Sequence, residues 1–387
     1  MRFIFSKNSN STRIAISLFF FAHGLVLSSW ASRIPSIKTQ LALTDAELGT
    51  LLLLLPIGQI STMPLSAKLI RTYGSQRSVR YGFLLYPLVL VLLGFATHYV
   101  TLALGLFFFG VLGNLCNIAI NTQGVELETR LNKSLMSSFH GAWSISGFIG
   151  ALFALGMLHY HLSTATHFIL VYFLVILLWV FSYKRLITVD PTPNKEREKG
   201  SIFKQLDKTL VQLGIIGFLS MAIEGAMFDW SGVYFQDIVQ APEHLIILGY
   251  TSFVLLMAIG RFLGDRLVTV LGHKKVIQYS GILMSSGLLL AVFFPHLLLT
   301  TFAFMLVGLG GSCSVPTLYG IAGKHPKVHP GTALTLVSSI AFLGFLLGPP
   351  VIGFISSSFD LRYSFALFSL FGIVMVLLGN KATLFKT

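Results

Sequence analysis

The chain has 387 residues, of which 54% are hydrophobic and 11% are charged, and its mean hydropathy is +0.80. Soluble domains carry roughly 25% charged residues, so this chain has too few charges to cover the surface of a soluble protein. The apolar residues lie in long blocks, and blocks of about 18 residues or more indicate membrane spans. The composition therefore excludes a soluble enzyme, a secreted protein and a disordered protein.

The formal net charge of +13 would indicate nucleic-acid binding only if the basic residues formed a patch on a folded surface. They lie instead in short runs between the apolar blocks, so we expect no nucleic-acid partner. Cys116 and Cys313 both fall inside apolar blocks and show neither a disulfide framework nor a metal-ligand spacing. We expect them to be packing residues, and we expect no metal and no cofactor.

Twelve apolar blocks are long enough to cross a bilayer, which takes about 20 residues. The predicted spans cover about residues 12–32, 48–69, 79–97, 101–124, 137–158, 165–183, 209–235, 246–264, 276–294, 297–321, 333–357 and 363–379. A cleaved signal peptide over the first block is the alternative, and it would leave eleven spans.

The basic residues orient these spans. If the N-terminus is cytoplasmic, 24 of the 27 Lys and Arg residues fall inside, and only Arg33, Lys38 and Arg362 fall outside. This asymmetry follows the positive-inside rule for an even number of spans. The fold class is therefore predicted to be an all-α integral membrane protein with twelve transmembrane helices and both termini cytoplasmic.

One polar segment, residues 184–208, separates the first six spans from the last six. It predicts a cytoplasmic linker between a six-helix bundle over 1–183 and a second over 209–387. The two halves resemble each other in sequence. Trp30 matches Trp230 at an offset of 200 residues, and the loop at Gly74 matches the loop at Gly272 at an offset of 198 residues. Repeated halves with pseudo-two-fold symmetry are typical of secondary transporters.

Several motifs spread along the whole chain resemble those of a known family. They are Trp30-Ala31-Ser32-Arg33-Ile34-Pro35, Asn121-Thr122-Gln123-Gly124, Ser138-Phe139-His140-Gly141-Ala142-Trp143-Ser144, Glu224-Gly225-Ala226-Met227-Phe228-Asp229-Trp230-Ser231 and Gly260-Arg261-Phe262-Leu263-Gly264-Asp265-Arg266. In these the chain resembles the major facilitator superfamily, and within it the YbjJ-like branch, which is distantly similar to the fucose permeases. The resemblance implies a solute carrier, often proton-coupled, in a bacterial cytoplasmic (inner) membrane. We expect it to act as a monomer.

The superfamily also has a loop motif after spans two and eight that looks like a latch of the cytoplasmic gate. The second copy is present here with Asp265, Arg266 and Gly272. In the first copy Arg71 stands where the family has an acidic residue. The resemblance therefore implies gating roles for the second copy and leaves open whether the first loop acts in gating.

Two carboxylates lie inside a predicted span, and ionisable groups there are costly enough to suggest function. Glu224 falls near the middle of span seven and Asp229 nearer its outer end. Because a carboxyl group removed from water retains a proton more readily, Glu224 is the first candidate for proton coupling. We expect no Lys or Arg at similar depth to neutralise it, since Arg261 falls near the inner end of span eight and is counted with the cytoplasmic basic residues. The alternative is a structural carboxyl group that braces span seven.

Three amides lie on one face of span four, Asn114, Asn117 and Asn121, within an arc of roughly 60°. They can hydrogen-bond a solute with hydroxyl or amide groups, or they can join neighbouring helices.

The other candidates for solute binding are ring side chains inside spans, and each has helix packing as its alternative. They are His23, Trp30, His140, Trp143 and Trp230. Arg33 is either an interfacial anchor or a partner for Asp229 at an outer gate. The run 308–316, with three glycines and Pro316, predicts a break in span ten, because irregular backbone is tolerated where it lines a cavity.

The sequence contains no Ser-His pair at nucleophile spacing, no His-Glu-x-x-His and no phosphate-binding loop, so an enzyme is not expected. The favoured function is a secondary transporter of a small polar solute, sugar-like or polyol-like. An exporter of drug-like compounds and a membrane sensor on the same fold remain as alternatives.

Overall fold

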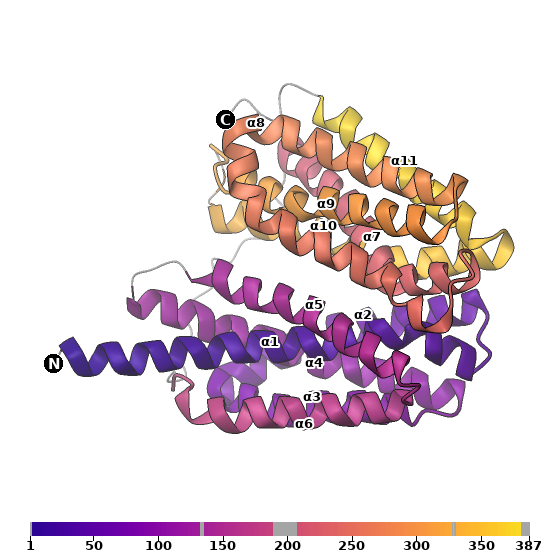
Figure 1. The fold of residues 1–387 in the computed structure, drawn as a ribbon. Coiled ribbons are helices and arrows are strands. Elements are labelled where there is room, and N and C mark those ends of the chain that lie inside the picture. The colour runs from indigo at the N-terminus through magenta and orange to yellow at the C-terminus, as the bar shows by residue number, and fades with distance from the viewer. Residues whose placement is uncertain (1, 132–134, 189–206, 327, 329, 381–387) are drawn as a thin grey trace. The chain divides into compact units, whose positions relative to one another are not determined.

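The computed structural model describes residues 2–131, 135–188, 207–326, 328 and 330–380. Its described elements are all helical (Figure 1). The α-helices are α1 (Arg2–Gln40), α2 (Asp45–Tyr73), α3 (Ser75–Gly94), α4 (Tyr99–Leu131), α5 (Met136–His159), α6 (Thr164–Ser182), α7 (Lys208–Asp237), α8 (Leu248–Phe293), α9 (Leu297–Ala322), α10 (Pro330–Ser358) and α11 (Leu361–Gly379). Two short 3-10 helices, η1 (Tyr183–Arg185) and η3 (Glu243–Leu245), accompany them.

In the described part of the chain, twelve helical segments are long and apolar enough to cross a membrane. Ten α-helices contribute one segment each, and α8, whose backbone leaves helical geometry at Gly272, contributes to two. The predicted all-α fold with twelve spans is therefore confirmed, and the protein is a multi-pass membrane protein. Several helices extend beyond the predicted spans, since α1 continues to Gln40 and α4 to Leu131.

The predicted break in span ten is wrong. Helix α9 runs without interruption through residues 308–316, with Pro316 inside it. The glycines instead allow close packing: a methyl group added at Gly308 would overlap the carbonyl oxygen of Phe253, and one added at Gly310 would lie 2.7 Å from the carbonyl oxygen of Ser280. Small residues where helices approach are a general feature of membrane bundles.

The chain divides into two compact units by its internal contacts. The first unit comprises residues 1–42 and 54–195, and the second comprises residues 43–53 and 196–387. The N-terminal part of α2 therefore belongs to the second unit. There Ser356 donates a hydrogen bond to Asp45, and Gly49 packs against Gly353.

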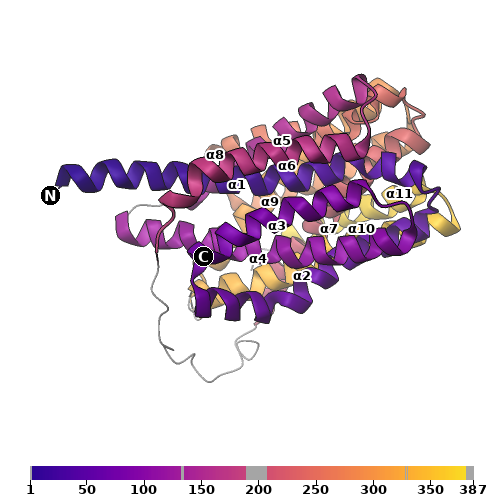
Figure 2. The ribbon, with the colours of Figure 1, turned by 90° about the horizontal axis from the view of Figure 1, so that it is seen from below.

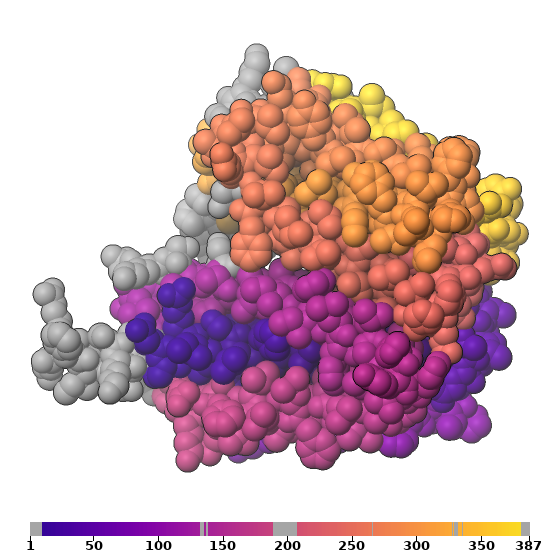
Figure 3. Space-filling view, viewed as in Figure 1, coloured from indigo at the N-terminus to yellow at the C-terminus, as the bar shows by residue number. Residues whose placement is uncertain are grey.

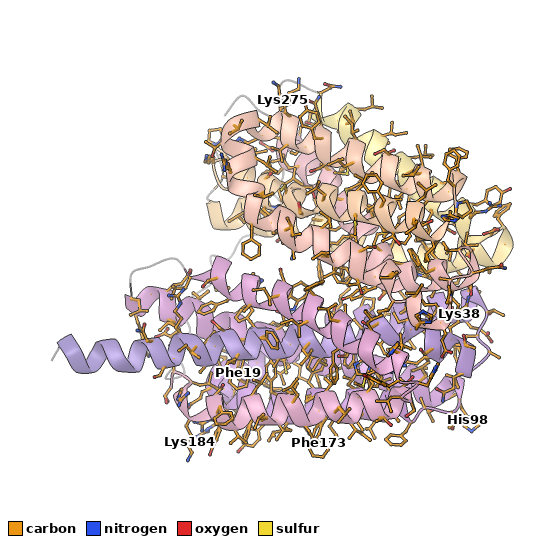
Figure 4. The ribbon with its side chains drawn as sticks, viewed as in Figure 1. Phe19, Lys38, His98, Phe173, Lys184 and Lys275 are labelled. Carbon is orange, nitrogen blue, oxygen red and sulfur yellow. The ribbon has the colours of Figure 1, made fainter. Side chains whose placement is uncertain are left out.

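Helix α1 is the most buried helix of the first unit and contacts α5, α6 and α4. Figure 3 shows it as a strip between the side chains of α5 and α6, and Figure 2 shows α3 beside α4. The side chains follow this arrangement in Figure 4. Phe19 of α1 is 2% exposed, whereas Phe173 on the outward face of α6 is 63% exposed, as expected for a lipid-facing side chain.

The segment that follows α6 is held on the first unit. Gln123 of α4 donates a hydrogen bond to the carbonyl oxygen of Ile187 and accepts one from its backbone N–H, each at 2.8 Å. Gln76 of α3 donates to the carbonyl oxygen of Leu186 at 3.1 Å. The start of the predicted linker is therefore ordered on α3 and α4, while its residues 189–206 lie outside the described part of the chain.

Helix α7 occupies the equivalent central place in the second unit, where it contacts α10, α9, α11 and α8. Its fully buried aromatic side chains hydrogen-bond to backbone carbonyls of its neighbours. Trp230 donates to Pro349 and Tyr234 donates to Ala291, each at 2.9 Å. These bonds satisfy polar groups that water cannot reach.

The internal repeat reappears in the backbone. Gly74 and Gly272 have nearly the same left-handed conformation, with φ/ψ of 83°/152° and 79°/156°. Gly110 packs on the carbonyl of Leu55 in the first unit, and Gly308 packs on the carbonyl of Phe253 in the second. Each residue of the second contact lies 198 positions after its counterpart in the first. The weak sequence repeat therefore reflects two structurally equivalent halves.

Candidate functional site

An ion pair lies inside the second unit. Arg261 of α8 donates a hydrogen bond from Nη2 to Oε1 of Glu224 on α7 at 3.1 Å. The Glu224 side chain is 8% exposed and that of Arg261 is 31% exposed. Glu224 lies near the middle of α7, and Arg261 lies 13 residues after Leu248 and 11 before Gly272 in α8. At about 1.5 Å per residue, Arg261 is roughly 16 to 20 Å from either end of its helical segment.

This pair corrects the sequence analysis. The expectation that no Lys or Arg lies at similar depth to Glu224 is wrong, because the guanidinium of Arg261 on α8 reaches the Glu224 carboxylate. The turn that follows this span is at Gly272, where the backbone leaves helical geometry. A buried carboxylate next to a guanidinium keeps its charge far more easily than an isolated one, so the pair stabilises the charged form of Glu224.

The surroundings of the pair are mixed. Tyr319 of α9 interacts electrostatically with Glu224. One helical turn earlier on α7, the Ser220 hydroxyl shares a hydrogen bond of 2.5 Å with that of Ser314 on α9. On the other side, Gly225 lies under Phe345 of α10, so that a methyl group there would be 2.6 Å from the Phe345 carbonyl oxygen. Hydroxyl groups and apolar packing therefore flank the charges.

Asp229 lies five residues after Glu224 on α7 and is partly exposed. Its side chain makes no hydrogen bond or ion pair with the described residues, and it interacts electrostatically with Tyr250 of α8. The buried hydroxyl of Tyr250 likewise has no hydrogen-bond partner in the described part of the chain. Asp229 and Tyr250 therefore form a second polar position in the unit, separate from the ion pair.

The candidate rings of the first unit are joined by hydrogen bonds. Trp143 donates from Nε1 to Nδ1 of His23 at 3.3 Å, and the His23 Nε2 lies 3.3 Å from the carbonyl oxygen of Gly113. Because Nδ1 accepts, the ring proton belongs on Nε2, which donates to Gly113. His23 also stacks on Tyr86 at a centroid distance of 5.4 Å. Both nitrogens of His23 are thus engaged, which makes it a linker between α1, α4 and α5.

The structure separates the three amides of α4. Asn114 is 6% exposed and donates to the hydroxyl of Ser66 on α2 at 3.3 Å, so it joins helices. Asn121 donates to the side-chain oxygen of Asn117 at 2.9 Å, and Asn117 is exposed. Of the three amides, Asn117 and Asn121 are therefore the ones that a solute can reach.

The remaining candidates differ in accessibility. Trp30 is 1% exposed and packs near Phe109, with ring centroids 6.3 Å apart, and Trp230 is fully buried. In this structure both are packing residues. His140 is exposed and lies edge-on to Phe20 at 5.3 Å, so it is the ring of this set that solvent can reach.

Arg33 is 2% exposed and is therefore no interfacial anchor. It donates to Nδ1 of His167 at 3.1 Å and to the carbonyl oxygen of Leu162 at 2.9 Å, both within the first unit. A role for Arg33 toward Asp229 stays a prediction. Of the gate residues, Arg266 is exposed and Gly272 forms the turn, while the side chain of Asp265 lies outside the described part.

Sequence reasoning missed Arg261, Tyr319 and His167. The repeat could have placed Arg261, because matching Gly272 with the turn at Gly74 puts Arg261 eleven residues inside a helix. Nothing in the sequence pairs His167 with Arg33, since they are 134 residues apart. Among the described residues no group of three or more His, Cys, Asp and Glu side chains could hold a metal ion.

Comparisons with known proteins agree with this architecture. Membrane protein MosC of Rhizobium meliloti is 31% identical over 367 residues, which are 94% of this chain and 88% of the relative. An uncharacterized MFS-type transporter of Yersinia pestis is 30% identical over 355 residues, 92% of this chain and 91% of the relative. The crystal structure of the nucleoside transporter NupG shares the fold, with a TM-score of 0.75 at 13% identity over 97% of this chain and 99% of that chain.

The family model described as Major Facilitator Superfamily matches residues 14–240 and 213–382. These two matches together cover most of the chain and both of its repeated halves. The chain therefore belongs to the major facilitator superfamily.

Proposed function

We propose that the chain is a proton-coupled secondary transporter of a small polar solute, sugar-like or polyol-like, that works by alternating access. The superfamily and the fold support a secondary transporter. We further place it in the YbjJ-like branch, distantly related to fucose permeases, and in a bacterial inner membrane with both termini cytoplasmic. NupG is a nucleoside transporter by name, and a nucleoside also belongs to the class of hydroxylated polar solutes.

The observation that carries the coupling proposal is the ion pair between Glu224, near the middle of α7, and Arg261, in the part of α8 that precedes Gly272. A proton that binds Glu224 removes its negative charge and weakens its attraction to Arg261. Since the pair joins two helices, its protonation state biases which conformation the carrier occupies. Proton binding at this depth, far from either helix end, is what a proton-coupled carrier requires.

The accessible amides support a polar solute. Asn117 and Asn121 present amide donors and acceptors on one face of α4. A mostly apolar surface would suit a drug-like compound better. Export of drug-like compounds and a sensor without transport are therefore outcomes of the test below.

The test uses purified protein in proteoliposomes with radiolabelled sorbitol, glucose and uridine. Wild type should accumulate its solute under an imposed pH gradient. Glu224→Gln mimics the protonated carboxyl group, so it should retain solute counterflow and lose pH-driven accumulation. Glu126→Gln, which removes an exposed ion pair with Arg130, serves as the matched control and should behave as wild type.

Each other result has a defined meaning. Accumulation by Glu224→Gln equal to wild type would transfer the coupling role to Asp229 or His23. Binding of a solute without any movement would favour the sensor, and uptake of amphipathic dyes in place of sugars would favour the exporter.

A further inference from the structure

Asp229 is the accessible position in an otherwise buried stretch of α7. Every residue of this helix from Ala222 to Phe235 is buried except Asp229, which is partly exposed. Carboxylates within membrane spans almost always face the interior of a bundle or a water-filled space, because contact with lipid is very costly for them. A solute in that space can therefore reach Asp229, whereas the neighbouring side chains of α7 are closed to it.

Tyr250 joins this position from the first turn of α8. The two helices approach closely here, because a methyl group added at Gly249 would lie 2.4 Å from the carbonyl oxygen of Ser231 on α7. Tyr250 is 1% exposed and interacts electrostatically with Asp229, and its hydroxyl has no hydrogen-bond partner in the described part of the chain. A buried hydroxyl without a partner is unfavourable, so a ligand that bonds to it at Asp229 is favoured.

The charge of Asp229 is not balanced by a cation of the described chain. The guanidinium of Arg261 pairs with Glu224, which lies five residues earlier on α7. At the start of α11, Arg362 lies 3.8 Å from Asp360. An ionised carboxylate without a counterion is strongly unfavourable inside a bundle, and a cation brought by the solute removes this imbalance.

Aromatic rings next to Asp229 also favour a cation. The ring of Phe228 lies 5.5 Å from that of Phe253 on α8 and 5.9 Å from that of Phe345 on α10. The ring of Tyr250 lies edge-on to Phe228 at 5.8 Å. Aromatic faces carry the negative part of the ring quadrupole, so they attract ammonium groups and repel carboxylates. The surroundings of Asp229 therefore suit a cation better than an anion.

We propose that Asp229 and Tyr250 bind a protonated amino group of the transported solute. This inference rests on the proposed function and narrows its solute to an amino sugar or an amino polyol. An ammonium group has several N–H donors and no acceptor, so it can donate to the Asp229 carboxylate and to the phenolic oxygen of Tyr250 together. A neutral hydroxyl group could bond to the same atoms, but it would leave the carboxylate charge unpaired.

The experiment measures the apparent Tm of purified protein at pH 7 with D-glucamine, sorbitol, methylammonium or sodium, and with potassium chloride at equal ionic strength as reference. D-Glucamine is sorbitol with one hydroxyl replaced by an amino group, so this pair isolates the contribution of the charge. D-Glucamine should stabilise wild type more than sorbitol does, by roughly 2 °C at about ten times Kd. Methylammonium, which carries the amino group alone, should also stabilise wild type.

Three variants locate the response. Asp229→Asn keeps the size of the side chain and removes its charge, so both amines should stabilise it no more than sorbitol does. Tyr250→Phe removes only the hydroxyl and should weaken the apparent affinity for both amines about tenfold, which corresponds to one lost hydrogen bond. Asp237→Asn changes an exposed carboxylate at the end of the same helix. It is the matched control and should respond as wild type does.

Three results would overturn the inference: amines that stabilise wild type no more than sorbitol or potassium does, an Asp229→Asn response equal to that of wild type, or a rise with sodium as large as with the amines. If Asp229→Asn does not fold, Tyr250→Phe decides, and an unchanged affinity overturns the inference. Proton-driven accumulation of a neutral sugar without any response to amines would overturn this inference and uphold the proposed function. Amine binding at Asp229 by a protein without pH-driven transport would do the reverse.

Discussion

Glu224 and Arg261 are an unusual pair of residues to place inside two membrane helices. Taking two charges out of water costs several kcal/mol for each, and their attraction offsets this cost only while both are present. We propose that this pair serves the exchange of a proton.

The two members of the pair should respond unequally to removal. Glu224→Gln leaves a guanidinium that cannot lose its proton, so we expect a loss of about 3–5 kcal/mol. Arg261→Gln leaves a carboxyl group that can become neutral by taking up a proton, so the loss should be smaller. At pH 7 the folded Arg261→Gln protein then holds a proton on Glu224 that the unfolded chain does not hold. The stability of this variant should therefore increase as the pH is lowered.

Apparent Tm of the purified variants in detergent between pH 5.5 and 8 checks this asymmetry. Replacing both residues, with Glu224→Leu and Arg261→Met, should restore much of the stability because both charges of this pair are removed. The exposed pair of Glu126 and Arg130 is the control, and Glu126→Gln should cost about 0.5 kcal/mol or less. Equal losses in the two single variants would contradict the account of the pair.

The amides of α4 should separate by function. Asn117→Leu removes an exposed amide, so it should weaken solute binding by about 1–3 kcal/mol with little change in stability. Asn114→Leu removes the bond to buried Ser66, so it should lower stability and leave affinity nearly unchanged. Titration of each purified variant with the solute, together with its apparent Tm, distinguishes the two. Weaker solute binding in Asn114→Leu together with lower stability in Asn117→Leu would refute these two roles.

At the scale of the helices, close approach of backbones holds each unit together. Gly110 on α4 meets the Leu55 carbonyl of α2, and Gly308 on α9 meets the Phe253 carbonyl of α8. In a bilayer, helix association depends on van der Waals packing because lipid is as apolar as the side chains. Positions where only a hydrogen atom fits therefore contribute directly to stability.

Substituting alanine at these contacts should be costly. In Gly110→Ala and Gly308→Ala the new methyl group overlaps backbone that cannot move aside, so each should lose at least about 1–3 kcal/mol. A methyl group at Gly156 or Gly320 meets nothing within 4 Å. Gly156→Ala and Gly320→Ala should instead gain about 0.5–1 kcal/mol from reduced backbone freedom in the unfolded state. Apparent Tm values of the four variants, measured in parallel, check the predicted losses and the predicted gains in stability.

The helices could be predicted from the sequence because bilayer thickness sets their length and composition. Apolar blocks located all twelve spans, and depth alone identified Glu224. The exact ends could not be read in this way, since a polar residue such as Arg261 at the end of an apolar block can lie in a loop or inside a helix. A glycine cluster is equally ambiguous: residues 308–316 suggested a break, yet they serve packing in a continuous α9.

The partners of the site residues were harder to predict. The bonds from Arg261 to Glu224, from Trp143 to His23 and from Arg33 to His167 join residues 37, 120 and 134 positions apart. Such pairs depend on how each helix is rotated about its axis, and an apolar block with little periodicity does not determine that rotation.

For the whole molecule, the charge asymmetry predicts which side of the membrane each end of the first unit faces. His98 and Lys184 lie at opposite ends of this unit (Figure 4), and both are exposed. In a background with Cys116 and Cys313 replaced by alanine, His98→Cys should react with an impermeant maleimide only from outside, and Lys184→Cys only from the cytoplasm. Labelling of Lys184→Cys from outside would reverse the predicted topology.

The central claim is that Glu224 takes up and releases a proton while it lies beside Arg261 in the second unit. Infrared difference spectra of the purified protein, recorded at acid pH minus neutral pH, measure this directly and need no solute. Wild type and Asp229→Asn should both gain a band from a protonated carboxylic acid at acid pH, and Glu224→Gln should lack that band. An identical band in wild type and Glu224→Gln would contradict the claim.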